Sequence, residues 1–133
     1  MIGFDTNLVV RLMVEDDAVQ ARRARNLLEE AAERDERVLV SDIVLSELEW
    51  VLEVAYKVPR RRILAALNTL VADDRFCFED RHRVAMALNL YQRGRGDLAD
   101  YLIGLRSEAV GVRTTFTFDR DLNDDSRFTV VRT

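Results

Sequence analysis

Short apolar runs alternate with longer segments of helical periodicity along the whole chain. Each run is short enough to be a buried strand, and the runs cover residues 1–4, 38–40, 75–78, 112–118 and 128–131. The spacing of apolar residues predicts helices over residues 8–13, 42–56, 80–93 and 97–110, with two more after Asp16–Asp17 and after Pro59. Because strands alternate with helices throughout, the sequence predicts an α/β fold with a parallel, doubly wound sheet.

Composition indicates one compact domain over residues 1–133, with 48% hydrophobic and 33% charged residues. No apolar run is long enough to span a membrane, and the N-terminus lacks the basic start of a signal peptide. The single cysteine, Cys77, excludes an internal disulfide and fits a reducing cytoplasm, where we expect the protein to act. The single histidine, His82, cannot build a histidine metal site, so we expect a surface or structural role for it.

The net charge of −4 argues against a generally basic surface that coats nucleic acid. Lys57 is the only lysine, so nearly all the positive charge is arginine. The arginines at 60–62, 93 and 95 either form a phosphate-binding rim around an acidic centre or solvate the ends of helices. Taken one at a time, each arginine fits the second interpretation better.

Acidic residues stand where strands end and helices begin. Asp5 follows the first apolar run, and Asp119 follows the run Thr115–Phe118. In open α/β sheets the carboxyl ends of strands are where ligands bind, although Asp5 is equally typical of a helix cap. Asp97 and Asp100 lie three residues apart, so both carboxylates share a helix face, and Asp97 also fits a partner for the helix dipole.

The helix over residues 42–56, which Ser41 is expected to cap, carries the sharpest single signal. On a helical wheel Glu49 and Glu53 fall on a polar face, whereas Glu47 falls alone inside a wide apolar arc. A buried carboxylate without a partner is costly, so we expect Glu47 to need a cation, a hydrogen-bonding partner or a raised pKa. An ion pair with one arginine is the plainer explanation of the same position.

Four segments, FDTN, LSELEWVLE, GDLADYLIGL and TFTFD, together resemble the PIN-domain ribonucleases, and most closely the VapC toxins of bacterial toxin–antitoxin pairs. The resemblance covers essentially the whole chain. It implies a three-layer sandwich with a five-stranded parallel sheet of order 3-2-1-4-5, flanked by helices. In that order Asp5 and Asp119 emerge on either side of the switch point between the first and fourth strands.

The resemblance also implies a set of functional residues. The catalytic and metal-binding acids would be Asp5, Glu47, Asp100 and Asp119, with Asp97 as a further metal ligand. Thr6, Asn7 and Thr117 would orient them, and Asp121 would be an outer acid. Converging carboxylates repel each other, and oxygen ligands select hard ions, so we expect Mg²⁺ or Mn²⁺. Such ions hold a scissile phosphate and activate water, and the resemblance implies hydrolysis of RNA to a 5′-phosphate and a 3′-hydroxyl.

As a resembling toxin, the chain is expected to bind RNA as substrate and a small antitoxin as partner. The antitoxin would have an N-terminal DNA-binding part, and its C-terminal segment would lie in a groove of the early helices near Val10, Leu27 and Val51. An arginine of that segment would enter the acidic site. We also expect a homodimer, with a higher-order assembly when the antitoxin is bound.

Two alternatives remain open at the level of sequence. A haloacid-dehalogenase-like phosphatase also uses acids at strand ends, but its second aspartate would fall at Asn7 and its lysine would have to be Lys57. A non-enzymatic module whose acids hold a structural ion or a basic partner is the other alternative. A nuclease assay with and without Mg²⁺ separates it from the ribonuclease.

Overall fold

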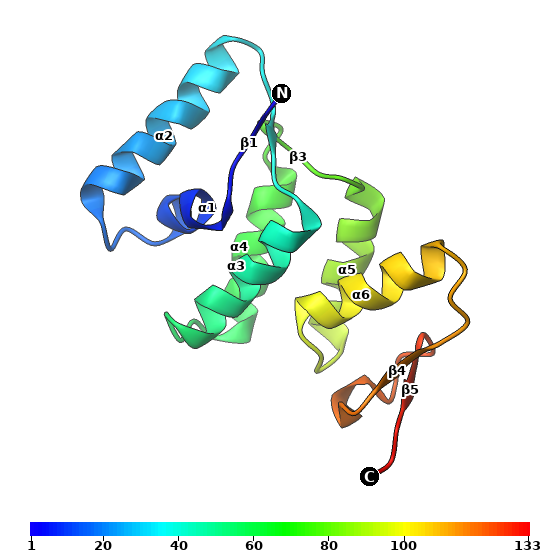
Figure 1. The fold of residues 1–133 in the computed structure, drawn as a ribbon. Helices are drawn as coiled ribbons and strands as arrows, with labels where there is room; N and C mark the ends of the chain where they lie inside the picture. The colour runs from blue at the N-terminus through cyan, green and yellow to red at the C-terminus, as the bar shows by residue number, and fades with distance from the viewer.

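A computed structural model describes residues 1–133, and it consists of helices packed around short parallel strands (Figure 1). None of the helices has the length and apolar character needed to cross a membrane. In chain order the elements are β1 (Ile2–Gly3), α1 (Thr6–Met13), α2 (Ala18–Glu33), β2 (Val38–Leu39), α3 (Asp42–Val54), α4 (Arg60–Ala72), β3 (Phe76–Cys77), α5 (Arg81–Arg93), α6 (Leu98–Ala109), β4 (Thr115–Thr117), the 3-10 helix η1 (Arg120–Leu122) and β5 (Phe128–Val130).

The helices begin at or close to the predicted residues, and α1 starts at Thr6, two residues earlier than predicted. Asp17 caps α2 by accepting a hydrogen bond from the Gln20 N–H at 3.0 Å. Ser41 caps α3 through its hydroxyl, which accepts from the Val44 N–H at 3.2 Å. Pro59 is the residue directly before α4, where its missing N–H costs no helical hydrogen bond. Side-chain acceptors at these positions satisfy backbone donors that the helix cannot pair itself.

The strands form two separate sheets, so the prediction of one five-stranded sheet is wrong. In the first sheet β1 pairs with β2 and β2 with β3, all parallel, which agrees with the 3-2-1 half of the expected order. In the second, β4 pairs with β5, also parallel, which agrees with the 4-5 half. No pairing joins β1 to β4, and Figure 1 shows β4 and β5 beside α6 and away from β1.

Two local features accompany the absence of a pairing between β1 and β4. β1 contains only two residues, one of which is Gly3, and glycine weakens a strand because it has no side chain to pack. The β4–β5 unit packs instead on α6 through Phe128. A Cβ atom added at Gly104 of α6 would lie 2.8 Å from the Phe128 ring, so the ring occupies the space that a side chain there would need. As a result the Phe116 and Phe118 side chains, 64% and 71% exposed, lie open to solvent.

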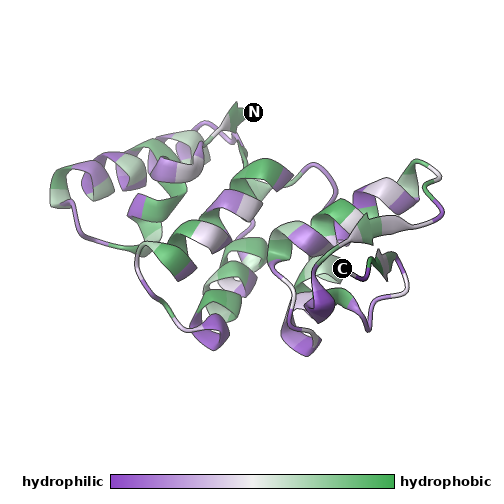
Figure 2. Ribbon diagram, turned by 60° about the horizontal axis from the view of Figure 1, so that its bottom comes forward, coloured by the Kyte–Doolittle hydropathy of each residue, from purple (hydrophilic) through white to green (hydrophobic).

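One continuous core joins the two parts of the chain. It holds 24 buried residues, from Phe4 after β1 to Phe128 in β5, and the helices carry hydrophobic residues on some sides and hydrophilic residues on others (Figure 2). Cys77 is only partly buried, and His82 is exposed, which agrees with the surface role expected of it.

A buried ion network fixes the start of α3 against α5 and α6. The Asp42 carboxylate, only 2% exposed as a residue, pairs with Arg83 of α5 at 2.8 Å and with Arg106 of α6 at 3.1 Å. The Asp42 N–H donates to the Glu79 carboxylate at 2.7 Å. A buried charge needs such partners. The network therefore holds α6 at a fixed place relative to α3, the helix that carries Glu47 and Glu49.

Candidate active site

Asp5 and Glu47 are joined through Thr6, at the contact between α1 and α3. Asp5 is the N-cap of α1, and its Oδ1 accepts from the Leu8 N–H at 3.1 Å, so the capping interpretation of this residue is correct. The Thr6 hydroxyl donates to Glu47 Oε1 at 2.8 Å. This hydrogen bond fixes the direction of the Glu47 carboxylate, which is the kind of orienting contact expected of Thr6. Asn7 is exposed.

The wheel assignment of Glu47 and Glu49 is wrong. Glu47 is exposed, whereas Glu49 is only 2% exposed. The buried face of α3 runs through Asp42, Leu45, Leu48, Glu49 and Leu52, and apolar Ile43, Trp50 and Val54 lie on the exposed side. Because two acids lie on the buried face and three large apolar residues lie on the exposed side, hydropathy alone predicts the wrong buried face for α3.

Glu49 is buried because it holds the N-terminus of α6. Its Oε1 accepts a hydrogen bond from the Leu98 N–H at 2.9 Å. Burial, together with the neighbouring carboxylates of Glu53 and Asp97, raises the pKa of Glu49 to about 7, and the Leu98 N–H partly offsets this rise. Sequence reasoning missed Glu49 and Glu53. Their i, i+4 spacing on the same helix was the available sign that both face one neighbour.

The first turn of α6 carries Asp97 and Asp100. The Asp97 N–H donates to Asp100 Oδ2 at 3.0 Å, so Asp100 closes the helix start. Burial raises the pKa of both carboxyls; the Glu53 and Asp100 charges add to the rise at Asp97, and the Asp119 charge adds to it at Asp100.

The loop before α6 is held by groups outside the acidic set. Arg60 of α4 donates to the carbonyl oxygens of Tyr91 at 2.8 Å and Gly96 at 2.6 Å, and its guanidinium lies 3.8 Å from the centre of the Tyr91 ring. The Gly96 N–H donates to the Tyr101 hydroxyl at 2.9 Å. Of the arginines considered for a phosphate rim, Arg60 is therefore part of the frame that positions α6.

Asp119 follows β4 and caps η1. Its Oδ1 accepts from the Asp121 N–H at 2.9 Å, and its own N–H donates to the Thr117 hydroxyl at 3.0 Å. Thr117 therefore orients the Asp119 backbone, while Asp121 is an exposed neighbour. The Asp119 charge adds to the raised pKa of both Asp97 and Asp100, so it acts on the same two acids.

The acids fall into two groups that share α3. The first group consists of Asp5 and Glu47, with Thr6 bonded to Glu47. The second group consists of Glu49 and Glu53 on α3 together with Asp97, Asp100 and Asp119. The carboxylate oxygens that lie within 4.8 Å of one another belong to Glu49, Glu53 and Asp97. The carboxylates of the expected set, Asp5, Glu47, Asp100 and Asp119, do not lie within this distance of one another in the metal-free chain.

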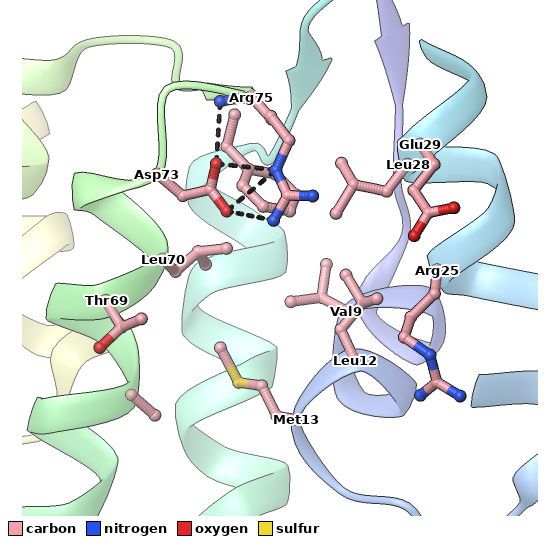
Figure 3. Close-up of a pocket in the computed structure, with 12 residues that line it drawn as sticks. Val9, Leu12, Met13, Arg25, Leu28, Glu29, Thr69, Leu70, Asp73 and Arg75 are labelled. Atoms are coloured by element: carbon pink, nitrogen blue, oxygen red, sulfur yellow. Dashed lines mark hydrogen bonds and ion pairs between the residues drawn. The ribbon is translucent and has the colours of Figure 1, made fainter. Parts of the chain in front are cut away.

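A separate apolar hollow lies between α1, α2 and α4 (Figure 3). It has a volume of about 420 Å³, with Val9, Met13 and Leu70 in its lining. On one rim Asp73 accepts two hydrogen bonds from Arg75, at 3.0 and 2.7 Å, and Arg25 of α2 lies on the other side (Figure 3). None of the acids discussed above lines it, so this hollow is not part of the acidic site.

The acids of this α/β chain lie at strand ends and helix starts, and no histidine or cysteine lies among them. The site is therefore of the acidic class, in which every ligand is a carboxylate oxygen. A PIN domain profile matches residues 2–125, and the chain belongs to the PIN-domain family. It is also similar to a VapC ribonuclease of Aquifex aeolicus (strain VF5), with 27% identity over 115 residues, which cover 86% of this chain and 84% of the relative. Family membership removes the support for a haloacid-dehalogenase-like phosphatase.

The raised pKa of Glu49 predicts how stability depends on pH in metal-free protein. A carboxyl whose folded pKa lies above its unfolded value stabilises the fold below the unfolded pKa, and this contribution is lost as pH rises through the folded pKa. The pKa of Glu49 is 4.5 in the unfolded chain and about 7 in the folded chain. The free energy of unfolding should therefore fall by on the order of 3 kcal/mol between about pH 4.5 and about pH 8. Urea unfolding in the presence of a chelator measures it.

Glu49→Gln serves as the control for this pH dependence, because glutamine has the same size and does not titrate. The variant should remove most of the slope between about pH 5 and about pH 8. A wild-type stability that stays level or rises over this interval would show that Glu49 titrates normally and that its burial is not costly.

Proposed function

We propose that this protein is a metal-dependent endoribonuclease that hydrolyses RNA phosphodiester bonds as the toxin of a toxin–antitoxin pair. The observation that carries the proposal is the group of acids on α3, α6 and the end of β4, where burial and neighbouring charges raise the pKa of Asp97 and Asp100. PIN-family membership and the similarity to a protein named VapC ribonuclease support the same function.

The chemistry of these donors fits a hard divalent cation. All the candidate side chains offer carboxylate oxygen, which Mg²⁺ and Mn²⁺ prefer. Carboxylates that raise one another's pKa values gain stability when a cation is added. Asp5, Glu47, Asp100 and Asp119 would hold the ion, with Asp97 as a further ligand. When bound, Mg²⁺ or Mn²⁺ lowers the pKa of water and polarises the scissile phosphate.

Neighbouring residues of the protein orient the candidate acids. Thr6 holds Glu47 by a 2.8 Å hydrogen bond, and Thr117 holds the backbone of Asp119 by one of 3.0 Å. Asp100 uses Oδ2 to accept from the Asp97 N–H, and its Oδ1 is left for a ligand. These contacts limit the rotamers of the acids, so that less freedom is lost when RNA and cation bind.

Two isosteric substitutions test the proposal. Glu47→Gln and Asp100→Asn remove one charge each and keep a carbonyl oxygen in the same place, so the hydrogen bonds from Thr6 and from the Asp97 N–H survive. Mg²⁺-dependent cleavage of RNA should fall by about a hundredfold or more in each variant, on the order of 3 kcal/mol of transition-state stabilisation.

The matched control is Glu30→Gln on the exposed side of α2, which should cleave RNA like the wild type within about twofold. Urea midpoints of the three variants show that they are folded. If wild-type protein fails to cleave RNA in Mg²⁺ and in Mn²⁺, the nuclease proposal is wrong, and a binding module takes its place. If Glu47→Gln is fully active, Glu47 is not a ligand.

A second part of the proposal concerns partners. The expected antitoxin carries an N-terminal DNA-binding part, and we place its C-terminal segment against α1 and α2. Val10 is only 1% exposed, so the expected contact with this residue is wrong. Leu27 is 43% exposed and lines a hollow of about 390 Å³ between α1 and α2, which also includes Asp5. A segment bound there reaches the acidic site directly.

We also place a second copy of the chain on the exposed side of α3, which would form the expected homodimer. Ile43, Trp50 and Val54 are 70%, 58% and 51% exposed there and supply an apolar surface. Because this surface and the hollow beside Leu27 lie on different elements, a dimer leaves the antitoxin position free. The proposed place of action is the cytoplasm, where RNA and antitoxin are both present.

Leu27→Glu tests the antitoxin position. A carboxylate on this wall of the hollow should weaken neutralisation by the cognate antitoxin by about tenfold or more, because an apolar contact becomes a buried charge. Ribonuclease activity without antitoxin should be unchanged. The control is Val19→Glu, at a 65% exposed position of α2 outside the hollow. If the antitoxin neutralises the Leu27→Glu and Val19→Glu proteins equally well, it does not bind in the hollow beside Leu27.

A further inference from the structure

We propose that Glu49 is a positioning residue, whose buried carboxylate holds the N-terminus of α6 and thereby sets where Asp97 and Asp100 lie relative to α3. The inference rests on the proposed function, because it concerns the same acids. It assigns Glu49 a role outside the set of direct ligands. The 2.9 Å hydrogen bond from the Leu98 N–H to Glu49 Oε1 is its starting point.

The first turn of α6 has backbone donors that the helix itself cannot pair. Asp97 is the N-cap of this helix and forms a capping box with Asp100, in which each side chain faces the backbone N–H of the other residue. Within this box Asp100 accepts from the Asp97 N–H at 3.0 Å, and Glu49 accepts from a further donor, the Leu98 N–H. The contact from α3 therefore adds to the capping box and ties the first turn of α6 to a second helix.

Glu49 makes one of two side-chain polar contacts between α3 and α6. It contacts Leu98, the first residue of α6, and Asp42 pairs at 3.1 Å with Arg106 in the last turn. Two contacts at opposite ends of one helix fix its direction as well as its distance from α3. Both acids are only 2% exposed, although Arg106, the partner of Asp42, is half exposed. Loss of the Glu49 contact would remove the polar link between α3 and the end of α6 that carries Asp97 and Asp100.

The competing assignment makes Glu49 a direct metal ligand. Its carboxylate oxygens lie within 4.8 Å of those of Glu53 and Asp97, close enough for one cation to contact all three. The two assignments differ in what Glu49 must supply. A positioning residue needs only an oxygen that accepts from the Leu98 N–H, whereas a ligand in this group needs the negative charge.

Glu49→Gln and Glu49→Leu separate these requirements. Glutamine keeps the acceptor without the charge, and leucine fills similar space with no acceptor. Two readouts are measured: hydrogen exchange of the Leu98 amide in metal-free protein, and the dissociation constant of Mn²⁺. In Glu49→Leu the amide should exchange about tenfold faster, and the Mn²⁺ constant should rise by about tenfold or more. In Glu49→Gln both should stay within about twofold of wild type.

Each other outcome overturns the inference. If Glu49→Gln loses Mn²⁺ affinity as strongly as Glu49→Leu while its Leu98 amide stays protected, Glu49 is a ligand. If Glu49→Leu binds Mn²⁺ normally, the contact has no positioning role. Glu49→Met, unbranched and without an acceptor, replaces the leucine variant if that does not fold. Wild-type protein that binds Mn²⁺ but cleaves no RNA would disprove the nuclease proposal and leave the positioning result intact.

Discussion

Repulsion between carboxylates at the junction of α3 and α6 is the constraint that shapes this structure. Glu49, Glu53 and Asp97 bring their oxygens within 4.8 Å of one another, and Asp100 and Asp119 lie close enough for their charges to interact. Such a group opposes folding unless its members are paired, protonated or bound to a cation. Hydrogen bonds from backbone N–H groups stabilise these carboxylates, and their raised pKa values favour protonation. A divalent cation would neutralise the remaining charge.

The frame around the acids consists of contacts that hold α6. Asp42 and Arg106 fix one end of this helix, and Glu49 and Leu98 fix the other. Arg60 holds the loop that enters it, through the carbonyl of Gly96. The acids therefore stand on rigid helices that many contacts support, which is what a site that orients a phosphate requires. The exposed Glu47 depends on a single contact, with Thr6.

Much of this arrangement could be predicted from the sequence, because caps and periodicity are local signals. Asp17, Ser41 and the glycine-broken segment before α6 mark helix ends that depend on neighbouring residues alone. The face of α3 could not be predicted in this way. Its buried side contains Glu49, which is satisfied by a backbone group 49 residues further along the chain, and no wheel includes such a partner. Long-range pairing also decided the sheet, where β4 packs beside α6 and not against β1.

Crystals grown in Mn²⁺ would test the central claim most directly, since anomalous scattering locates this ion independently of activity. The account predicts a site with Asp100 as a ligand, at about 2.2 Å for Mn²⁺–oxygen bonds, together with at least one of Asp5, Glu47 and Asp119. Glu49 should remain hydrogen-bonded to the Leu98 N–H. An ion held only by Glu49, Glu53 and Asp97, or no ordered ion at saturating Mn²⁺, would contradict the account.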